Sequence, residues 1–248
     1  MTDLPLNKPA GILVKTTCVD YPGIVAGSFF LKGCNLRCPY CYNIGLVLPS
    51  KDEELATVEE LFNHLEKRQG ILKGLVISGG EPLINPYTPI IIKKARELGY
   101  KIKLDTNGSL PDELSYFVNN EELKPDFIAM DIKTSPERYA NTICNKVSNV
   151  WGNSDFFVKM VSKCAQIVSE YPQDQREFRT VLVPGLVTKE DIKKMAEILP
   201  ADASWQFAQF KNENCLDPSY NSISPYTDKE INELLSYAKS LIPGAALR

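Results

Sequence analysis

The sequence has no apolar run long enough to cross a membrane, no cluster of basic residues and only one histidine. A membrane-spanning helix needs about 18 or more consecutive apolar residues, so we expect no membrane association. Lysines and arginines are spread along a chain of net charge −3, which argues against nucleic acid as a partner. The lone histidine, His64, lies off the apolar stripe of its predicted helix, and we assign it no role.

Signals of secretion and of domain division are also missing. The amino terminus lacks the basic and then apolar pattern of a signal peptide, so we expect a cytoplasmic protein with reduced thiols. Seven cysteines, an odd number, argue against a disulfide framework. No linker rich in glycine, serine or proline and no repeat divides the chain. We therefore predict a single domain over residues 1–248, with a core of about 18–210 and a C-terminal helix of about 227–242.

Three of the cysteines lie within eight residues, at Cys34, Cys38 and Cys41, with the spacing C-x3-C-x2-C. Structural zinc sites and the common iron–sulfur clusters use four protein ligands. Three thiols therefore suggest a cluster in which one iron is left open for a ligand other than protein. A zinc site or buried core thiols are the alternatives, with Cys18 as a candidate distant fourth ligand. The roles of Cys18 and Cys215 stay open.

Six predicted strands alternate with predicted helices along the whole sequence. The strands comprise residues 25–31, 74–78, 101–105, 127–131, 178–183 and 204–210. The helices comprise 57–68, 89–98, 156–169, one from 111, and two that follow the capping residues Thr188 and Thr227. This alternation predicts a parallel sheet covered by helices. Six units are too few to close an eight-stranded barrel, which leaves an incomplete barrel or an open doubly wound sheet.

Each unusual motif falls at the C-terminal end of a predicted strand. The cysteine trio follows the first strand and Ser78-Gly-Gly-Glu-Pro82 the second. Asp105-Thr-Asn-Gly108 follows the third, Asp131-Ile-Lys133 ends the fourth, and Val183-Pro-Gly185 ends the fifth. Ligands bind at this end of the strands in parallel α/β folds, so we expect these motifs to converge on one site.

The cysteine spacing, Tyr40 before the third cysteine and the Gly-Gly-Glu segment together resemble the radical S-adenosylmethionine (SAM) superfamily. The resemblance runs nearly end to end. Within the superfamily it is strongest to the activases of glycyl radical enzymes, and among these to the activating proteins of anaerobic ribonucleoside-triphosphate reductases. It implies a partial (β/α)6 TIM-like barrel, with the cluster and SAM at the C-terminal ends of the strands.

The activity and partners implied by this resemblance are specific. Cys34, Cys38 and Cys41 would hold three irons of a [4Fe–4S] cluster, and SAM would bind the fourth. Reductive cleavage of SAM would give a 5′-deoxyadenosyl radical, which takes hydrogen from a glycine of a large glycyl radical enzyme. An anaerobic ribonucleotide reductase is the expected partner, and reduced flavodoxin or ferredoxin the expected electron donor.

The resemblance also implies roles for residues at the strand ends. Gly79 and Gly80 would approach the amino group of SAM, although glycines also serve a plain turn. Glu81 is included in this motif, where its carboxylate would contact SAM or brace the loop. Asp105 would meet the amino end of the methionine, and Asn107 belongs to the same motif.

The resemblance also implies roles for residues of the fourth and fifth strands and for Tyr40. Lys133 would meet the carboxylate of SAM and Asp131 its ribose hydroxyls, unless the two pair with each other. Tyr40 would pack near the adenine, with an ordinary core aromatic as the alternative. Arg179 would lie beside the site or serve as an ion-pair partner.

Three positions depart from the activase pattern, so the partner enzyme is assigned less firmly than the superfamily. Tyr42 follows the third cysteine where histidine is expected, and Val187 stands where a second histidine is usual. Gln209 would replace a histidine near the ribose. An alternative is therefore a radical SAM enzyme acting on a small molecule or peptide, such as a 7-carboxy-7-deazaguanine synthase-like enzyme. A non-catalytic zinc or electron-transfer protein is a further alternative.

Overall fold

The computed structural model describes residues 4–48, 55–144 and 154–248. Its contacts divide the chain into two compact units that exchange segments along the sequence. Unit 1 comprises Met1–Asn35, Gly45–Thr106 and Glu113–Phe127. Unit 2 comprises Leu36–Ile44, Asn107–Asp112 and Ile128–Arg248. The single domain expected from the sequence stays a prediction.

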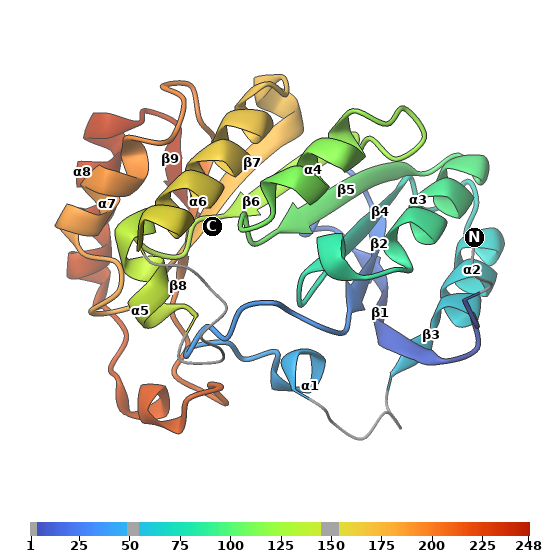
Figure 1. The fold of residues 1–248 in the computed structure, drawn as a ribbon, viewed down its shortest axis with the longest axis horizontal. Helices are drawn as coiled ribbons and strands as arrows, with labels where there is room; N and C mark the ends of the chain where they lie inside the picture. Colours follow the sequence, from blue (N-terminus) through green and yellow to red (C-terminus); the bar gives the residue numbers. More distant parts are fainter. Residues whose placement is uncertain (1–3, 49–54, 145–153) are drawn as a thin grey trace. The chain divides into compact units, whose positions relative to one another are not determined.

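Unit 1 is built on a mixed sheet with the strand order β3-β1-β2-β4-β5. Strands β2, β4 and β5 are parallel, and β1 pairs antiparallel with both β2 and β3. Helices α2 and α3 lie side by side in this unit (Figure 1). The strands are β1 (Pro9–Thr17), β2 (Ala26–Leu31), β3 (Ala56–Thr57), β4 (Gly74–Gly79) and β5 (Lys101–Thr106). The helices are α1 (Ile44–Val47), α2 (Val58–Lys67), α3 (Thr88–Glu97) and α4 (Pro111–Val118), with the 3-10 turn η2 (Pro82–Ile84).

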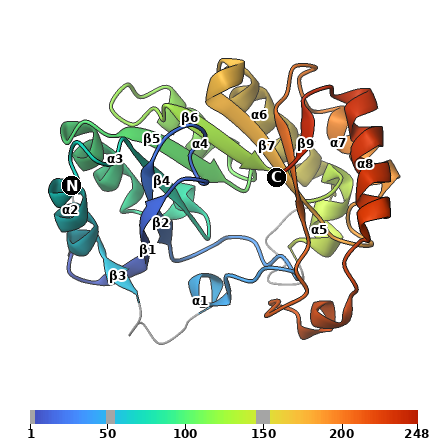
Figure 2. The ribbon, with the colours of Figure 1, turned by 180° about the vertical axis from the view of Figure 1, so that it is seen from behind.

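Unit 2 is built on parallel strands in the order β6-β7-β8-β9. Helices α7 and α8 pack against each other, and α8 also contacts β9 (Figure 2). The strands are β6 (Phe127–Asp131), β7 (Arg176–Leu182), β8 (Trp205–Gln209) and β9 (Ala245–Leu247). The helices are α5 (Tyr139–Thr142), α6 (Ser154–Ser169), α7 (Lys189–Ala196) and α8 (Asp228–Leu241). The 3-10 turns are η3 (Pro136–Arg138), η4 (Gln173–Gln175) and η5 (Pro218–Ser222).

The parallel strands are buried on both faces, which explains their nearly continuous apolar sequences. Leu75, Val76 and Ile77 follow one another in β4 and are all fully buried. Side chains of a strand alternate between its faces, so a run of buried residues requires cover on each side. The same pattern occurs in β2 and β6.

The predicted α/β class and the parallel strands are confirmed. All six predicted strands are present, with ends that differ by no more than two residues, and helices follow Thr57, Thr188 and Thr227 as capping residues. The strands β1, β3 and β9 were missed. In the described part of the chain, no helix is both long and apolar enough for a membrane crossing.

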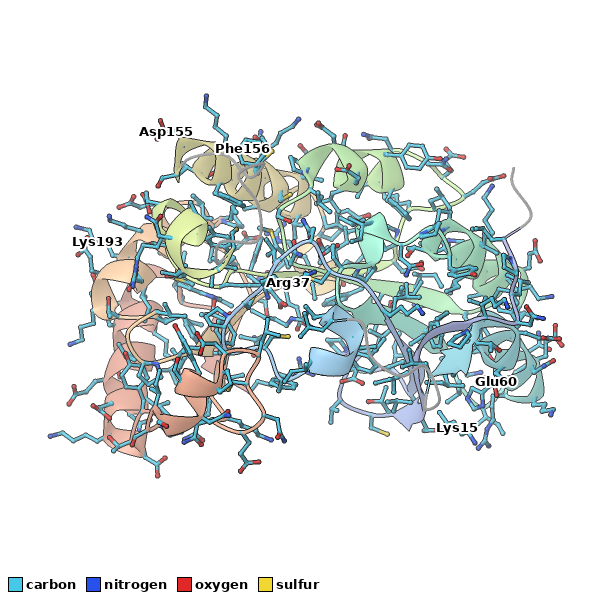
Figure 3. All side chains as sticks on the ribbon, turned by 60° about the horizontal axis from the view of Figure 1, so that its bottom comes forward. Lys15, Arg37, Glu60, Asp155, Phe156 and Lys193 are labelled. Atoms are coloured by element: carbon cyan, nitrogen blue, oxygen red, sulfur yellow. The ribbon has the colours of Figure 1, made fainter. Side chains whose placement is uncertain are left out.

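The start of α2 gives a stability prediction, because its capping contacts lie at the surface. The Thr57 side chain accepts a hydrogen bond from the Glu60 N–H at 3.0 Å, and the Glu60 carboxylate accepts one from the Thr57 N–H at 2.7 Å. Glu60 lies at the outer surface of unit 1 (Figure 3). Thr57→Ala removes the first bond, and we expect it to lower the free energy of unfolding by about 1 kcal/mol. Thr57→Ser keeps the hydroxyl and serves as the control in urea denaturation; equal stability of the two variants would contradict the capping role.

Candidate active site

The first cysteine of the trio follows a tight turn at the end of β2. Gly33 has a φ of +96°, in the left-handed region that glycine adopts without strain. Its N–H donates a hydrogen bond to the carbonyl of Leu46 at 2.7 Å, and the Lys32 N–H donates to the carbonyl of Ala10 at 2.9 Å. These bonds fix the backbone immediately before Cys34, whose side chain is partly exposed.

The two glycines at the end of β4 pack directly on this turn. The Gly80 N–H donates to the carbonyl of Leu31 at 2.9 Å, and the Glu81 N–H donates to that of Gly33 at 2.8 Å. A Cβ atom on Gly79 would lie under 3.0 Å from the backbone of Leu31, and one on Gly80 under 3.0 Å from the carbonyl oxygen of Gly33. Close backbone approach therefore requires both glycines, whereas their contact with SAM stays a prediction.

Glu81 braces the same loop from within. Its side chain is fully buried, and Oε1 accepts hydrogen bonds from the Leu83 N–H at 3.1 Å and the Thr106 hydroxyl at 3.0 Å. The first bond caps η2, and the second ties the end of β4 to the end of β5. Of the two roles considered for Glu81, the structure shows the brace.

Asp105, at the end of β5, forms a buried ion pair. Nζ of Lys103 lies 2.6 Å from Oδ1 of Asp105. The lysine side chain is completely buried, and only 10% of the aspartate side chain is exposed. The sequence indicated Asp105 as a site residue but gave Lys103 no role.

The second half of the cysteine loop belongs to unit 2. Cys38 is buried, Cys41 is partly exposed, and the Cys41 N–H donates to the Cys38 carbonyl at 3.0 Å in a tight turn. Two backbone hydrogen bonds hold this turn from the segment after β8. The Leu216 N–H donates to the carbonyl of Cys41 and the Asp217 N–H to that of Pro39, both at 2.9 Å.

The segment after β8 is itself organised by Asn221. Oδ1 of Asn221 accepts a hydrogen bond from the Cys215 N–H at 2.9 Å, and its carbonyl accepts one from Asn212. Burial, followed by the charges of Cys41 and Asp217, raises the pKa of the Cys215 thiol. Because the thiolate is the form that binds metals, these surroundings favour a structural role for Cys215.

A charged cluster lies where β6 and β7 end. The parallel register sets Asp131 opposite Arg179. Arg179 Nε donates to Asp131 Oδ1 at 2.8 Å, and Lys133 Nζ donates to Oδ2 at 3.2 Å. Burial alone would raise the pKa of the Asp131 carboxyl, but the charges of Arg179 and Lys133 outweigh it and lower the pKa. Asp131 and Lys133 thus pair with each other, which is the arrangement that the sequence analysis gave as the alternative to SAM binding.

Lys133 connects this cluster with the cysteine loop. Its N–H donates to the hydroxyl of the buried Tyr139 at 2.8 Å. Burial by itself would lower the pKa of Lys133, but the negative charges of Asp131 and then Cys38 hold it well above its usual range. Tyr40 is buried beside the same lysine, and burial raises its pKa. Unit 2 therefore places the Lys133 ammonium, paired with Asp131, near Cys38.

Asn107 stabilises the loop after β5. Its Oδ1 accepts hydrogen bonds from the N–H of Ser109 at 3.1 Å and from the Ser109 hydroxyl at 2.6 Å. The intervening Gly108 has a φ of +70°, and a Cβ there would clash with Met130. The structure gives Asn107 this bracing role, and its contact with SAM stays a prediction.

Unit 2 contains a cavity of about 410 Å³ that includes two predicted site residues, Tyr40 and Gln209. Its other lining residues are Tyr42, Val181, Ala208, Phe210, Lys211, Glu213 and Asn214. One wall is thus the aromatic part of the cysteine loop, and the other is the end of β8 with its following segment. The cavity combines an aromatic ring, apolar side chains and an amide, which suits a flat polar heterocycle.

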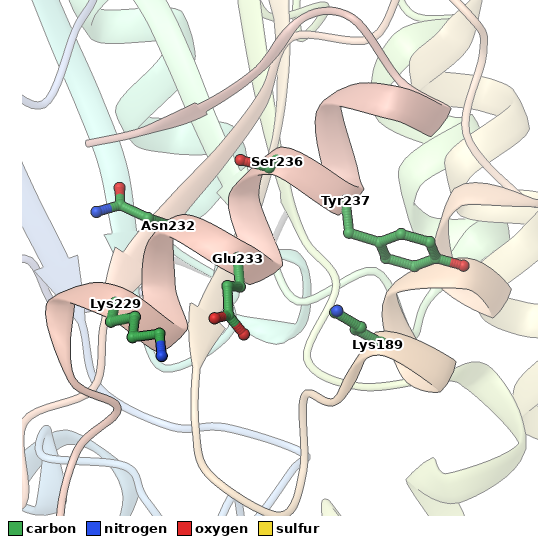
Figure 4. Close-up of a pocket in the computed structure, with 6 residues that line it drawn as sticks. All are labelled: Lys189, Lys229, Asn232, Glu233, Ser236 and Tyr237. Atoms are coloured by element: carbon green, nitrogen blue, oxygen red, sulfur yellow. The ribbon is translucent and has the colours of Figure 1, made fainter.

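A second hollow of about 810 Å³ lies on the surface between α7 and α8. Lys189 and Glu233 point toward the same space there, beside the ring of Tyr237 (Figure 4). None of the predicted site residues lines it, so it is separate from the candidate site.

The motifs described above are shared with a known protein family. Residues 28–199 match the radical SAM superfamily, which is more than half of the chain. The chain belongs to the radical SAM superfamily. The match includes the cysteine trio and every strand-end motif described above.

Relatives of this radical SAM protein include activating enzymes of glycyl radical enzymes. It is 29% identical over 238 residues to a Methanocaldococcus jannaschii protein named as a glycyl-radical enzyme activating enzyme, covering 95% of this chain and 94% of the relative. It is 34% identical over 188 residues to the pyruvate formate-lyase-activating enzyme of Clostridium pasteurianum, covering 73% and 71%. It is also 30% identical over 171 residues to the 7-carboxy-7-deazaguanine synthase of Aquifex aeolicus, covering 68% and 72%.

Solved structures agree on the fold. TYW1 with a lysine–pyruvate adduct bound aligns with a TM-score of 0.58 at 18% identity, covering 89% of this chain and 75% of that one. Coproporphyrinogen III oxidase of Escherichia coli, a radical SAM enzyme, aligns with a TM-score of 0.52 at 13% identity, covering 87% and 51%. The partial-barrel fold class expected for this superfamily is thereby confirmed.

The protein is an enzyme whose cofactors are a [4Fe–4S] cluster and SAM, as its family implies. Its donor set fits the cluster, since none of Cys34, Cys38 and Cys41 is in a disulfide. Within the described ranges, no three His, Cys, Asp or Glu side chains gather where they could hold a single metal ion. In a cubane cluster each cysteine binds a different iron, so its thiols do not share one ion.

The predicted site residues are divided between the two units. Unit 1 contains Cys34, Gly79, Gly80, Glu81 and Asp105, and unit 2 contains Cys38, Tyr40, Cys41, Asn107, Asp131, Lys133 and Arg179. Within unit 2 the structure brings together Cys38, Tyr40 and the Asp131 cluster. Cys18 is exposed in unit 1.

Sequence reasoning missed three residues that support the site: Lys103, Tyr139 and Asn221. Lys103 carried a misleading signal, because Lys101, Lys103 and Asp105 alternate with Ile102 and Leu104, a pattern typical of a strand with one exposed polar face. Tyr139 and Asn221 carried none, since no local sequence pattern connects them with the residues that they hydrogen-bond.

The packing of Gly80 predicts a steric effect on the cysteine loop. Gly80→Ala forces the Gly33 backbone to move, and we expect a loss of about 2 kcal/mol of stability together with reduced iron binding after anaerobic reconstitution. Gly27→Ala, in the adjacent strand β2, is the control because its Cβ has no neighbour closer than 3.7 Å. Equal iron content in the two variants would show that the contact does not shape the loop.

The role of Asn221 predicts a kinetic effect on the cluster. Asn221→Ala leaves the Cys215 N–H without its acceptor, which costs about 1–3 kcal/mol for a buried group and loosens the segment that holds Pro39 and Cys41. We expect iron to be released to a chelator several times faster than from the unaltered protein. Asn232→Ala, on the exposed face of α8, should release iron at the normal rate; matching rates for both variants would argue against the role of Asn221.

Proposed function

We propose that this protein activates a glycyl radical enzyme. The observation that carries the proposal is the nearly full-length match to a relative named as such an activating enzyme, supported by the match to a pyruvate formate-lyase-activating enzyme. When bound, the cluster and SAM supply a 5′-deoxyadenosyl radical, which would take hydrogen from a glycine of the partner.

In this proposal the chain supplies ligands, charges and shape. Cys34, Cys38 and Cys41 bind the cluster as thiolates. The ammonium of Lys133 lies near Cys38 and stays protonated because Asp131 is beside it. A fixed positive charge there favours the deprotonated thiolate and attracts the carboxylate of SAM.

The other end of the methionine requires a negative charge, which Asp105 provides. The ribose hydroxyls would be bound by Asp131, which Arg179 and Lys133 keep ionised and oriented. Arg179 acts through this carboxylate. Gly79 and Gly80, which keep side chains away from the turn before Cys34, would let the ligand approach the backbone closely.

The adenine would occupy the cavity lined by Tyr40 and Gln209. Tyr40 offers a buried ring for stacking, and Gln209, in place of the histidine that some activases have near the ribose, offers an amide. The amide of Gln209 also lies 3.5 Å from the carbonyl of Tyr226, so it can be held in place while it contacts the ligand.

The partner would be a large glycyl radical enzyme, and an anaerobic ribonucleotide reductase is the first to test. Reduced flavodoxin or ferredoxin would deliver the electron. A second candidate function is synthesis of a small molecule, favoured by the 30% identity to a 7-carboxy-7-deazaguanine synthase. The C-x3-C-x2-C spacing favours the activase, because those synthases generally depart from it around the cysteine loop.

The cofactor chemistry is tested first without any partner. Anaerobically reconstituted protein given dithionite and SAM should form 5′-deoxyadenosine, measured by liquid chromatography. Cys38→Ala should reduce both the bound iron and the product by at least about tenfold, because it removes a cluster ligand. Cys164→Ala is the matched control, since this buried thiol lies in α6 away from the loop. Full activity of Cys38→Ala would refute the assigned ligands.

The partner is tested with the reconstituted protein and candidate enzymes from the same source. Addition of a glycyl radical enzyme should produce a glycyl-radical doublet in electron paramagnetic resonance, and Cys38→Ala should not. If 7-carboxy-7-deazaguanine appears with the substrate of the synthases and no doublet forms with any candidate enzyme, the second function replaces the first.

A further inference from the structure

Lys103 is a completely buried lysine in a strand that ends at the candidate site. It lies two residues before Asp105 in β5, so both side chains emerge on the same face of the strand. Nζ of Lys103 is 2.6 Å from Oδ1 of Asp105, within a charge-assisted hydrogen bond. The aspartate is the outer member of the pair, because 10% of its side chain is exposed and none of the lysine's is.

The surroundings of the lysine are mainly apolar. Its ammonium lies 5.7 Å from the centre of the Phe127 ring, and its register partner in β4 is Val76. Both residues belong to a buried apolar cluster with Tyr21 and Ala26. An ammonium in such a place is costly unless it is paired, and lysine is almost never fully buried otherwise.

Stability does not account for this pair. A buried ion pair can often be replaced by apolar residues of similar volume with no loss of stability, because desolvation of both charges offsets their attraction. The role of Lys103 is therefore sought in its ion-pair partner Asp105, which is the member that reaches toward solvent.

We propose that Lys103 is a positioning residue for SAM, which holds the Asp105 carboxylate aimed at the amino group of the methionine. The inference rests on the proposed function, in which Asp105 meets that amino group. The charge-assisted hydrogen bond from Lys103 holds the carboxylate in place, and the exposed part of Asp105 is left facing solvent.

The test is the dissociation constant of SAM, measured by calorimetry on the anaerobic, cluster-loaded protein without any partner enzyme. Lys103→Met keeps the length of the side chain and removes its charge, and we expect SAM to bind about tenfold or more weakly. Asp105→Asn should weaken binding to a similar degree. Lys101→Met is the matched control, because this lysine lies on the same strand but is exposed, and its SAM affinity should be unchanged.

The double variant Lys103→Met/Asp105→Asn separates positioning from general damage. If Lys103 acts only through Asp105, the double variant binds SAM no more weakly than Asp105→Asn alone. It should also melt at a higher temperature than Asp105→Asn, since it no longer buries an ammonium without its carboxylate. Additive losses in SAM affinity would overturn the proposal.

Two further outcomes are decisive. Normal SAM affinity of Lys103→Met, with Asp105→Asn impaired, overturns the role of Lys103 and leaves the proposed site intact. Normal affinity of Asp105→Asn overturns the assignment of Asp105 and with it the inference.

Iron content and melting temperature are measured for every variant, and Lys103→Gln, which keeps a hydrogen-bond donor, replaces Lys103→Met if that variant does not fold. Failure of the activase proposal shows separately, as an absent glycyl-radical doublet with normal SAM binding.

Discussion

Close approach of two backbones at the ends of β2 and β4 is the constraint on which the first part of the site depends. Gly79 and Gly80 have no side chains, so the end of β4 can hydrogen-bond to the carbonyls of Leu31 and Gly33. Neighbouring parallel strands bring these backbones together, and any Cβ at either glycine would push them apart. The position of Cys34 follows from this contact, since it comes directly after Gly33. The buried carboxylate of Glu81 then ties the same turn to the end of β5.

The charges at the strand ends depend on a second balance, between the cost of burying a charged group and the gain from an opposite charge beside it. Burial opposes ionisation of Asp131, yet Arg179 and Lys133 reverse that effect and hold the carboxylate charged. Asp131 in turn raises the pKa of Lys133. Lys103 and Asp105 form a similar pair in unit 1. Each unit thus carries a carboxylate whose counter-cation comes from the protein.

Two departures from the activase pattern lie in different surroundings. Val187, which stands where a histidine is usual, is fully buried, and its carbonyl accepts a hydrogen bond from the Tyr226 hydroxyl at 3.2 Å. Tyr42, also in place of a histidine, is 62% exposed at the cavity that contains Tyr40 and Gln209. Only Tyr42 thus lines the cavity, and both changes leave the cysteine spacing intact.

The sequence by itself determined the six parallel strands, the capped helix starts and the residues of the cysteine loop. Each of these depends on interactions between residues a few positions apart: apolar runs, a threonine bonded three residues on, thiols within one loop. Only the tertiary structure decided that Lys103 is fully buried, that Tyr139 holds Lys133, and that the segment around Asn221 supports Cys41. It also decided the antiparallel strand β1, which lies between β2 and β3 and is partly exposed at Ile12 and Val14. Some of these contacts, such as the one between Leu216 and Cys41, join residues far apart in the chain, and others depend on burial; both follow from how the strands pair and pack, which no local pattern encodes.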